Sequence, residues 1–363
     1  KDPDAGYATD FISEAMVPNL KRISETNTKI ISNAGGVNPL ACAVLLRKKI
    51  EEQGISLKVA VIEGDETVAD AFSRLPFDHL LFTGSQRVGR LVAKAAAENL
   101  TPVTLEMGGK SPLIVAPSGN VAQAAACAAH GKMINAGQVC VAPDYAMVHE
   151  SQLRRFISEV KRASHKQYPT IRNNPDVSCV INSKHMARLR DLVEDARKKG
   201  AEIIEINPAH EVFEPSAKKF PLTLVVNPKP DMRVMQEEVF GSILPILAYR
   251  TLEEAVAQVQ TKERAIALYL FVSKQAEKDL VLSQTVSGGV TVNDAMWHVL
   301  NDHMPFGGVG ASGMGAYHGL VGFNAMSQLK PVLEQSRFNA APLLRAPYGK
   351  VFEKVVTVLK KIV

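Results

Sequence analysis

The stretch HLLFTGSQRVGRLVAKAAAE, residues 79–98, predicts the fold class of the chain. His79–Thr83 has the apolar character of a strand, and Gln86–Glu98 has the residue pattern of a helix. The same two patterns alternate upstream, strand-like at 29–32 and 57–62 and helical at 40–53 and 67–74. Alternation at this pace is typical of βαβ units, so we expect an α/β fold with a mostly parallel sheet.

The turn between this strand and this helix is a candidate anion-binding site. In parallel sheets, ligands bind at the carboxyl ends of the strands, where Gly84, Ser85 and Gly89 are expected to lie. Glycines allow close backbone approach, and a helix N-terminus offers N–H groups to an anion such as a pyrophosphate. The spacing is not G-x-G-x-x-G, so the turn taken alone favours a structural role.

Length and charge narrow the classes of protein. A chain of 363 residues predicts two or three domains, and 46% hydrophobic with 22% charged residues excludes global disorder. The net charge is +5, but residues 343–363 hold five cations and one anion, so the remainder sums to only about +1. This distribution excludes a nucleic-acid binder. No apolar run is long enough to cross a bilayer and the first residues do not resemble a signal peptide, which favours the cytoplasm.

The four cysteines are Cys42, Cys127, Cys140 and Cys179. They form no C-x-x-C pair and no Cys/His cluster with zinc-ligand spacing, so we expect no metal site. In a reducing compartment they are thiols, and only a special local setting would make one of them a nucleophile.

Two motifs between residues 101 and 145 carry the candidate chemistry. TLEMGGKSP, residues 104–112, places Glu106 at a predicted strand end beside two glycines. NAGQVCVAPDY, residues 135–145, places Cys140 in a loop whose N–H groups can stabilise a thiolate and then an oxyanion. A cysteine nucleophile with a carboxylate base suits covalent catalysis.

These motifs resemble those of the aldehyde dehydrogenase family, most closely the bacterial coniferyl-aldehyde branch of its class 3 type, from about Thr67 to the C-terminus. The matching landmarks occur in the family's order, which makes the resemblance specific. They are FTGS (82–85), LEMGGKSP (105–112), GQVC (137–140), EEVFG (237–241), PFGGVG (305–310), SGMG (312–315) and YHG (317–319).

The resemblance implies a role for each matching residue. Cys140 corresponds to the family's nucleophile and Glu106 to its general base. Gly84, Ser85 and Gly89 correspond to the pyrophosphate-binding turn, and Glu238 and Phe240 to the residues that hold the nicotinamide ribose and ring. The implied reaction oxidises an aromatic or aliphatic aldehyde to its acid with NAD or NADP, through a thiohemiacetal and a thioester on the cysteine.

Residues 1–65 resemble a different group, the acyclic terpene utilisation family. The marks are DAGYATDF (4–11), SNAGGVNP (32–39) and VIEGD (61–65). The dehydrogenase family has a Pro-Trp-Asn segment upstream, whose Asn completes the oxyanion hole, but the only tryptophan here is Trp297. An oxyanion donor contributes roughly 2.7–4 kcal/mol, so we expect weakened turnover unless Asn33 or Asn38 reaches the site. Asn in such loops is more typical of a turn.

We therefore expect a Rossmann-like cofactor domain with a substituted start, followed by an α/β catalytic domain. The boundaries fall at 1–66, 67–108, 109–320 and 321–363, the last segment ending in a basic amphipathic helix over 351–363. The resemblance implies a homodimer, and this helix favours packing on protein over contact with a membrane surface. Two alternatives stay open, a terpenoid-catabolism protein that is not a dehydrogenase and an inactive fusion that serves as a scaffold.

Overall fold

The computed structural model describes residues 5–214 and 216–361, which fall into two compact units. One unit comprises the chain up to Asp78 together with Leu91–Thr101, and the other comprises His79–Arg90 and the chain from Pro102 onward. Helix α4 begins in the second unit and ends in the first. The candidate site residues named above, from Gly84 to Phe240, all belong to the second unit.

The first unit is helical in its described part. Its elements are η1 (Phe11–Met16), η2 (Val17–Asn19), α1 (Leu20–Thr26), α2 (Pro39–Glu52) and α3 (Glu66–Ser73). Its core is built from buried apolar residues of η1, α1 and α2, among them Leu20 and Leu46. The side chain of Asn38 accepts the Ala41 N–H at the start of α2 and donates to the Ala5 carbonyl, which supports a turn role for this residue.

The prediction of strands at 29–32 and 57–62 is wrong. No strand is assigned over either segment, and Ile31 and Ile62 are exposed. A strand needs a paired neighbour to satisfy its N–H and C=O groups, and neither segment pairs with one. The β-branched residues of these two segments are therefore not sufficient to form a strand. The helices expected at 40–53 and 67–74 are confirmed within one residue at each end.

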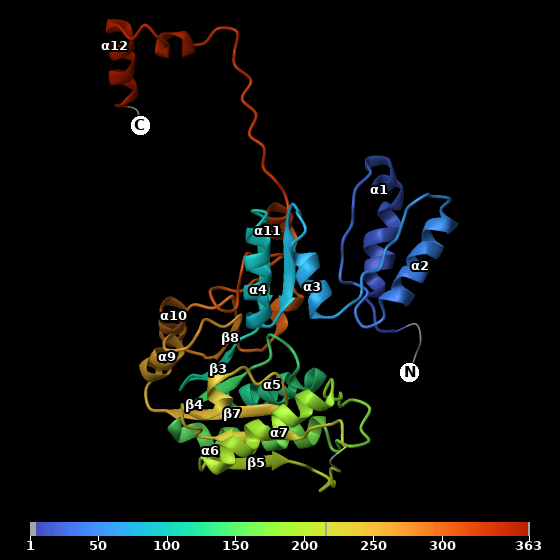
Figure 1. The fold of residues 1–363 in the computed structure, drawn as a ribbon. Coiled ribbons are helices and arrows are strands. Elements are labelled where there is room, and N and C mark those ends of the chain that lie inside the picture. The colour runs from blue at the N-terminus through green and yellow to red at the C-terminus, as the bar shows by residue number, and fades with distance from the viewer. Residues whose placement is uncertain (1–4, 215, 362–363) are drawn as a thin grey trace. The chain divides into compact units, whose positions relative to one another are not determined.

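The second unit contains a seven-stranded sheet in the order β5-β6-β7-β4-β3-β8-β9 (Figure 1). All its pairs are parallel except β5 with β6. The expected α/β class with a mostly parallel sheet is confirmed. The strands are β3 (Pro112–Val115), β4 (Tyr145–His149), β5 (Glu202–Ile206), β6 (Leu222–Val226), β7 (Ile243–Tyr249), β8 (Ala267–Phe271) and β9 (Gly289–Val292).

Helices cover both faces of this sheet, which explains why the central strands are apolar on both sides. Along β3, Leu113 packs with residues of α5 and α6, whereas the next residue, Ile114, packs with residues of α9 and α10. The helices of this unit are α5 (Val121–Met133), α6 (Leu153–Gln167), α7 (Ser183–Lys198), α8 (Arg233–Gln236), α9 (Leu252–Gln260), α10 (Gln275–Gln284), α11 (Gly319–Ala325) and α12 (Lys350–Leu359), with short turns η3 (Ile134–Gly137), η4 (Glu150–Gln152), η5 (Trp297–Leu300) and η6 (Ala341–Leu344).

A second, three-stranded sheet brings the candidate motifs of the cofactor turn and the base together. Its order is β1 (Leu80–Gly84), β2 (Val103–Met107) and β10 (Gly313–Met314). β1 and β2 are parallel, with Thr83 opposite Glu106, so both strands end at the same edge. Helix α4 (Gln86–Ala97) starts directly after β1.

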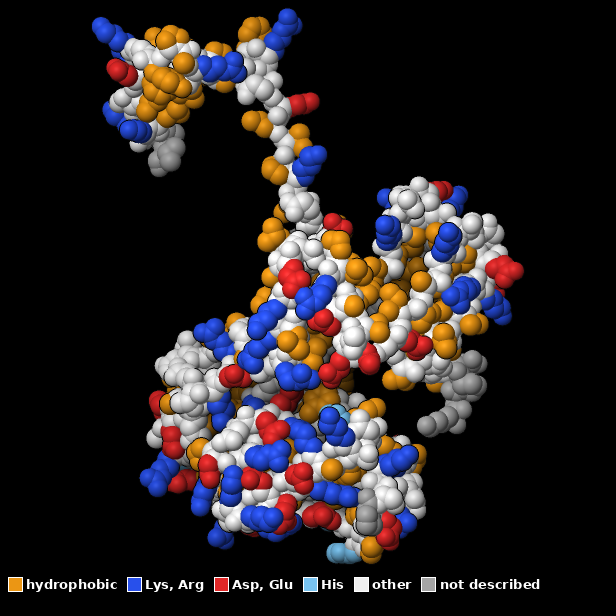
Figure 2. Space-filling model, in the orientation of Figure 1, with side chains coloured by type: hydrophobic (Ala, Val, Ile, Leu, Met, Phe, Trp, Pro, Cys, Tyr) orange, Lys and Arg blue, Asp and Glu red, His pale blue; other side chains and the backbone are white. Residues whose placement is uncertain are grey.

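The C-terminal helix α12 forms over Lys350–Leu359, close to the expected range, although Ile362 and Val363 lie outside the described residues. Figure 2 shows apolar side chains gathered over this segment with cations around them. Val351 and Val358 are among its exposed apolar residues. No helix in the described part of the chain has the length and apolar character needed to cross a bilayer.

Packing of α6 on the large sheet should dominate the stability of the second unit. Phe156 is fully buried in this core, so Phe156→Ala should cost about 3–5 kcal/mol of unfolding free energy. The matched control is Phe338→Ala, which truncates a side chain that is 90% exposed and should change it by under ~0.5 kcal/mol. Urea unfolding followed by circular dichroism measures both. Equal losses in the two variants would contradict this account of the core.

Candidate active site

The expected anion-binding turn lies between β1 and α4. Gly84 is the last residue of β1, and the Ser85 hydroxyl and carbonyl accept the N–H groups of Val88 and Gly89 at 3.4 and 2.9 Å. Gly89 packs its bare Cα against the side chain of Met107 on β2, so a larger residue would separate the helix from the sheet. The turn therefore presents the N-terminus of a 12-residue helix at the carboxyl edge of the small sheet.

Glu106 lies on β2 at the same edge and is almost fully buried. Neither of its carboxylate oxygens has a hydrogen-bond partner among the described residues. Burial raises the pKa of Glu106 to about 8, with the nearby Gly308 N–H opposing the shift. A buried carboxyl without a partner, which titrates near neutral pH, suits a general base or acid.

Cys140 follows a strained loop. Asn135, Ala136 and Gly137 all have positive φ angles, of 47°, 54° and 70°. Gly137 is required here, because a Cβ at this φ would also press on the Gly241 carbonyl at 2.5 Å. The Gln138 side chain holds the loop in place, since its amide nitrogen donates to the carbonyls of Asn135 and Cys179 at 2.9 and 3.1 Å.

The structure brings Cys140 into electrostatic contact with Glu106 and Glu238. Burial, the Glu238 charge and the Glu106 charge, in that order, raise the pKa of the half-buried Cys140 thiol. The backbone N–H groups of Val141 and Cys140 itself favour the thiolate and oppose the shift. Tyr317 belongs to the same surroundings, because the charges of Glu106 and Cys140 both raise its pKa. Loss of charge on either carboxylate would therefore remove part of the upward shift of the Cys140 pKa, while the larger contribution of burial would remain.

Glu238 occupies a cradle that only glycine leaves open. A Cβ at Gly108 would overlap the Glu238 carboxylate, so the two residues of these separate motifs are in direct contact. Burial and then the charge of Asp144 raise the pKa of Glu238 to about 7, while the Gly109 N–H and two lysines lower it. Phe240, two residues on, is 37% exposed and has a φ of 45°.

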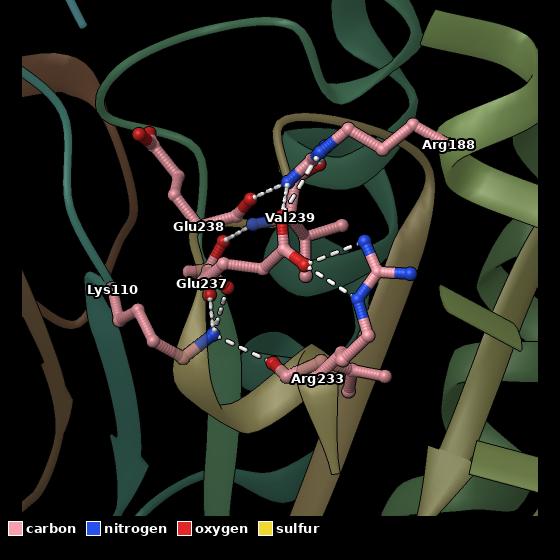
Figure 3. A network of polar contacts seen from close by, with 8 residues as sticks. Lys110, Arg188, Arg233, Glu237, Glu238 and Val239 are labelled. Atoms are coloured by element: carbon pink, nitrogen blue, oxygen red, sulfur yellow. Dashed lines mark hydrogen bonds and ion pairs between the residues drawn. The ribbon is translucent and has the colours of Figure 1, made fainter. Parts of the chain in front are cut away.

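Lys110 ties the Glu238 segment to the rest of the site (Figure 3). Its Nζ pairs with the buried Asp144 carboxylate and donates to the carbonyls of Val234 and Glu237 at 2.7 and 3.0 Å. The other oxygen of Asp144 accepts the Val239 N–H at 2.8 Å. Lys110 and Asp144 therefore fix the backbone on both sides of Glu238. These Lys110 contacts to Val234 and Glu237 span more than a hundred residues of sequence.

Two arginines complete this framework. Arg188 on α7 donates to the carbonyls of Glu238 and Val239, the latter at 2.7 Å, and pairs with the Glu237 carboxylate at 2.9 Å. Arg233 pairs with the second oxygen of Glu237, also at 2.9 Å. In Figure 3 the Glu238 carboxylate points away from these contacts, so it remains available to a ligand.

The residues present fit a dinucleotide. The helix N-terminus beyond Gly84 and Ser85 suits its pyrophosphate, and the Glu238 carboxylate over Gly108 suits hydroxyl donors of a ribose. The described residues offer no metal site, because they contain no group of three or more acidic, His or Cys side chains placed to hold an ion. Cys127 instead donates to Asp294 at 3.3 Å, and His298 hydrogen bonds to Thr291 at 2.8 Å, which are structural contacts.

The sequence does not reveal the residues that fix the backbone of the site. Asp144 lies within the cysteine motif, but nothing in the neighbouring sequence indicates that it binds Lys110 and Val239. Lys132 is a lysine near the end of an Ala-rich helix, and its full burial is apparent only in the structure. Arg188 carries no signal in the sequence, since its helix has many cations on its exposed face.

Fold and site together define an α/β protein with a cysteine after a strained loop, a buried carboxyl at a strand end and a turn that opens a helix N-terminus. The aldehyde dehydrogenase family model matches residues 27–332, and the chain belongs to that family. The match starts well before Thr67 and so includes most of the segment for which the sequence indicated a second resemblance. That second resemblance, to the acyclic terpene utilisation family, stays a prediction.

Relatives and solved structures agree with this assignment. The chain is 49% identical over 300 residues to a probable coniferyl aldehyde dehydrogenase of Caulobacter vibrioides, covering 82% of this chain and 62% of the relative. It is 44% identical over 319 residues to the coniferyl aldehyde dehydrogenase of a Pseudomonas species, covering 87% and 66%. The chain thus spans less than two thirds of the length of these relatives.

Among solved structures, the substrate-bound state of Staphylococcus aureus AldH superposes with a TM-score of 0.78 at 35% identity, covering 88% of this chain and 68% of that one. The indole-3-acetaldehyde dehydrogenase AldA of P. syringae, in complex with NAD+ and IAA, gives 0.72 at 27% identity, covering 81% and 60%. The expected fold, with its Rossmann-like and catalytic parts, is confirmed by these likenesses.

The buried carboxyl of Glu106 should make stability depend on pH. Its folded pKa of about 8 exceeds the ordinary value of 4.5, so the folded state binds more protons between these limits. Unfolding free energy should therefore fall as pH rises from 6 to 8, by up to about 1.4 kcal/mol per pH unit from this group. Glu106→Gln should remove this part of the slope, and the exposed Glu214→Gln should keep it. Urea unfolding at three pH values measures the slope of unfolding free energy against pH. A slope in Glu106→Gln equal to that of the wild type would show that Glu106 is already ionised.

Proposed function

We propose that the protein oxidises an aldehyde to the carboxylic acid with NAD or NADP, and that aromatic aldehydes of the coniferyl type are its substrates. Support comes mainly from one observation. The thiol of Cys140 lies within electrostatic reach of the Glu106 carboxyl, which has no hydrogen-bond partner among the described residues, and both belong to the region beside the turn between β1 and α4. The names of the two coniferyl relatives support the aromatic class.

In this mechanism the Cys140 sulfur adds to the aldehyde carbon and forms a thiohemiacetal. A bound NAD or NADP would supply the acceptor for the hydride of this carbon, and Cys140 would then carry the thioester. Glu106 then takes a proton from water, which attacks the thioester carbonyl, and the acid leaves as the sulfur departs. Glu238 would hold a ribose of the cofactor, and Gly84, Ser85 and Gly89 its pyrophosphate. Phe240 would contact its nicotinamide ring.

The raised pKa values fit a mechanism in which Cys140 and Glu106 act at different steps. While Glu106 is protonated it places no charge near Cys140, which favours formation of the thiolate. Its pKa of about 8 lets it lose its proton during the cycle and act as a base once the thioester has formed.

A rate assay separates this proposal from its alternatives. Coniferaldehyde with NAD+ or NADP+ should give NAD(P)H, and Cys140→Ala should lower the rate by roughly 10³-fold or more. Cofactor binding by calorimetry should survive in Cys140→Ala. Cofactor binding without acylation of Cys140 would favour an inactive scaffold, and neither activity would favour a non-dehydrogenase protein of terpenoid catabolism.

The base role of Glu106 is tested by a split between two steps. In Glu106→Gln, a single turnover of NAD(P)H should still form, while steady-state turnover falls by roughly 10²–10⁴ because thioester hydrolysis lacks its base. Glu214→Gln is the control and should keep the wild-type ratio. Equal loss in both phases would assign Glu106 to an earlier step.

The proposal also covers the oligomeric state of the protein and its location in the cell. We propose a homodimer, with the apolar face of α12 packed on protein rather than on a membrane surface. We also propose a cytoplasmic location, where the four cysteines would stay reduced. We also propose that residues 67–108 form the remainder of the cofactor domain and residues 109–320 the catalytic domain, with Glu106 acting in catalysis from the first and Glu238 and Phe240 binding cofactor from the second. Sedimentation of the chain with and without residues 346–363 measures the contribution of α12.

A further inference from the structure

Tyr269 is a buried tyrosine that the proposed chemistry does not use. It lies in the middle of β8 and is fully buried. Neighbouring strands fix its backbone on both sides, because Tyr269 lies opposite Leu113 of β3 and Thr291 of β9. A buried phenol needs a partner for its hydroxyl group. The hydroxyl of Tyr269 donates to the carbonyl of Val141, the residue that follows Cys140.

Val141 belongs to the turn that carries the sulfur. The Ala142 N–H donates to the Val139 carbonyl at 2.9 Å, which closes the turn with Cys140 and Val141 at its central positions. The peptide unit between Val141 and Ala142 is therefore held twice, since its N–H bonds to Val139 and its carbonyl accepts the hydroxyl of Tyr269. Through this second bond, the turn is attached to a strand inside the large sheet.

The orientation of this turn determines which groups face the sulfur. The backbone N–H groups of Cys140 and Val141 favour the thiolate and lower the pKa of the thiol, against the larger effect of burial. Successive backbone N–H groups in a turn are a common way to bind an anion, but only when the peptide units keep one direction. Because Val141 is fully buried, bulk water cannot replace the Tyr269 hydroxyl as the donor to its carbonyl.

The ring of Tyr269 is held as firmly as its hydroxyl. His298 packs against it with the ring centroids 6.1 Å apart, and His298 is itself hydrogen bonded to Thr291 of β9 at 2.8 Å. Burial lowers the pKa of His298, so this neighbour is uncharged at neutral pH. The phenol therefore has little freedom to turn away from the Val141 carbonyl.

The ionisable groups around the sulfur come from several elements. The charges of Glu238, after α8, and Glu106, on β2, raise the pKa of Cys140 in addition to burial. Burial and then the charges of Glu106 and Cys140 raise the pKa of Tyr317 to about 12. Burial and then the Cys140 charge raise the pKa of Tyr269 well above its ordinary value, so its hydroxyl is a neutral donor. Tyr269 differs from the two carboxyls because it adds no charge and is bonded to the turn itself.

We propose that Tyr269 is a positioning residue, whose hydroxyl holds the turn of Cys140 by the Val141 carbonyl and so keeps the N–H groups of the turn directed at the sulfur. The role of this sulfur as a nucleophile rests on the proposed function; the hydrogen bond and its effect on the thiol do not. Without the hydroxyl, the buried carbonyl would lack a donor and the turn would shift to find one. The thiolate would then lose part of its stabilisation, and the thiol would become a weaker acid.

Alkylation of Cys140 by iodoacetamide tests this role without cofactor or substrate. Because the thiolate is the form that reacts, the rate at each pH gives the midpoint of the thiol, and peptide mass spectrometry separates Cys140 from the other cysteines. In Tyr269→Phe this midpoint should rise by about 0.5–1 pH unit, so that alkylation below the midpoint slows about three- to tenfold. An unchanged or lower midpoint would overturn the proposal.

Tyr249→Phe is the matched control. Tyr249 is a buried tyrosine of β7 in the core beneath α9, and its hydroxyl donates to the Val115 carbonyl at 2.6 Å. This variant loses the same kind of bond at a place remote from the turn of Cys140 in the sequence and on the other face of the sheet, so the midpoint should stay that of the wild type. An equal shift in both variants would indicate general loosening of the fold and contradict a positioning role.

Replacement of Tyr269 by 4-aminophenylalanine keeps a donor on the same ring and covers the case in which Tyr269→Phe does not fold. The midpoint should then stay within about 0.3 pH unit of the wild type, a twofold change in proton affinity. A shift as large as about one pH unit despite the retained donor would overturn the proposal. If coniferaldehyde gives no NAD(P)H with the wild type while these midpoints behave as expected, the proposed function fails and the positioning role stands.

Discussion

The candidate site depends on the buried carboxylate of Asp144. This one side chain binds Lys110 from the loop before β3 and the Val239 N–H from the loop after α8. Through Lys110 it also fixes the carbonyls of Val234 and Glu237. Three stretches far apart in the sequence thereby acquire one geometry. Removal of either charged partner would leave the other buried and unpaired, which is far more costly than loss of an exposed pair.

Burial of the reactive groups follows from this framework. Glu106, Cys140 and Glu238 each have a raised pKa, and burial is the largest cause in all three. At neutral pH Glu106 and Glu238, with pKa values of about 8 and about 7, are therefore close to the boundary between their charged and uncharged forms. A site of this kind responds strongly to any further charge placed in it, because few water molecules screen the interaction. The chemistry proposed for Cys140 and Glu106 uses that sensitivity.

Local patterns in the sequence predicted most elements of the second unit and the positions of its motifs. The strand expected at 79–83 and the helix expected at 86–98 match β1 and α4, because the strand pairs with β2 along its length. The segments 29–32 and 57–62 have the same local character yet form no strand, because pairing is a property of neighbours rather than of the segment. Lys132 and Arg188 escaped prediction for a related reason, as their partners are fixed only by the tertiary fold.

The three consecutive left-handed residues before Cys140 have a consequence for motion. Asn135, Ala136 and Gly137 hold a backbone shape that an isolated peptide would rarely adopt, and the Gln138 side chain ties it to residues 179–181. Opening of the loop would release the strain but break several hydrogen bonds at once, so intermediate shapes are disfavoured. The sulfur is thus presented by a loop that is either wholly formed or wholly open, and hydrogen exchange of its amides should show a single cooperative step.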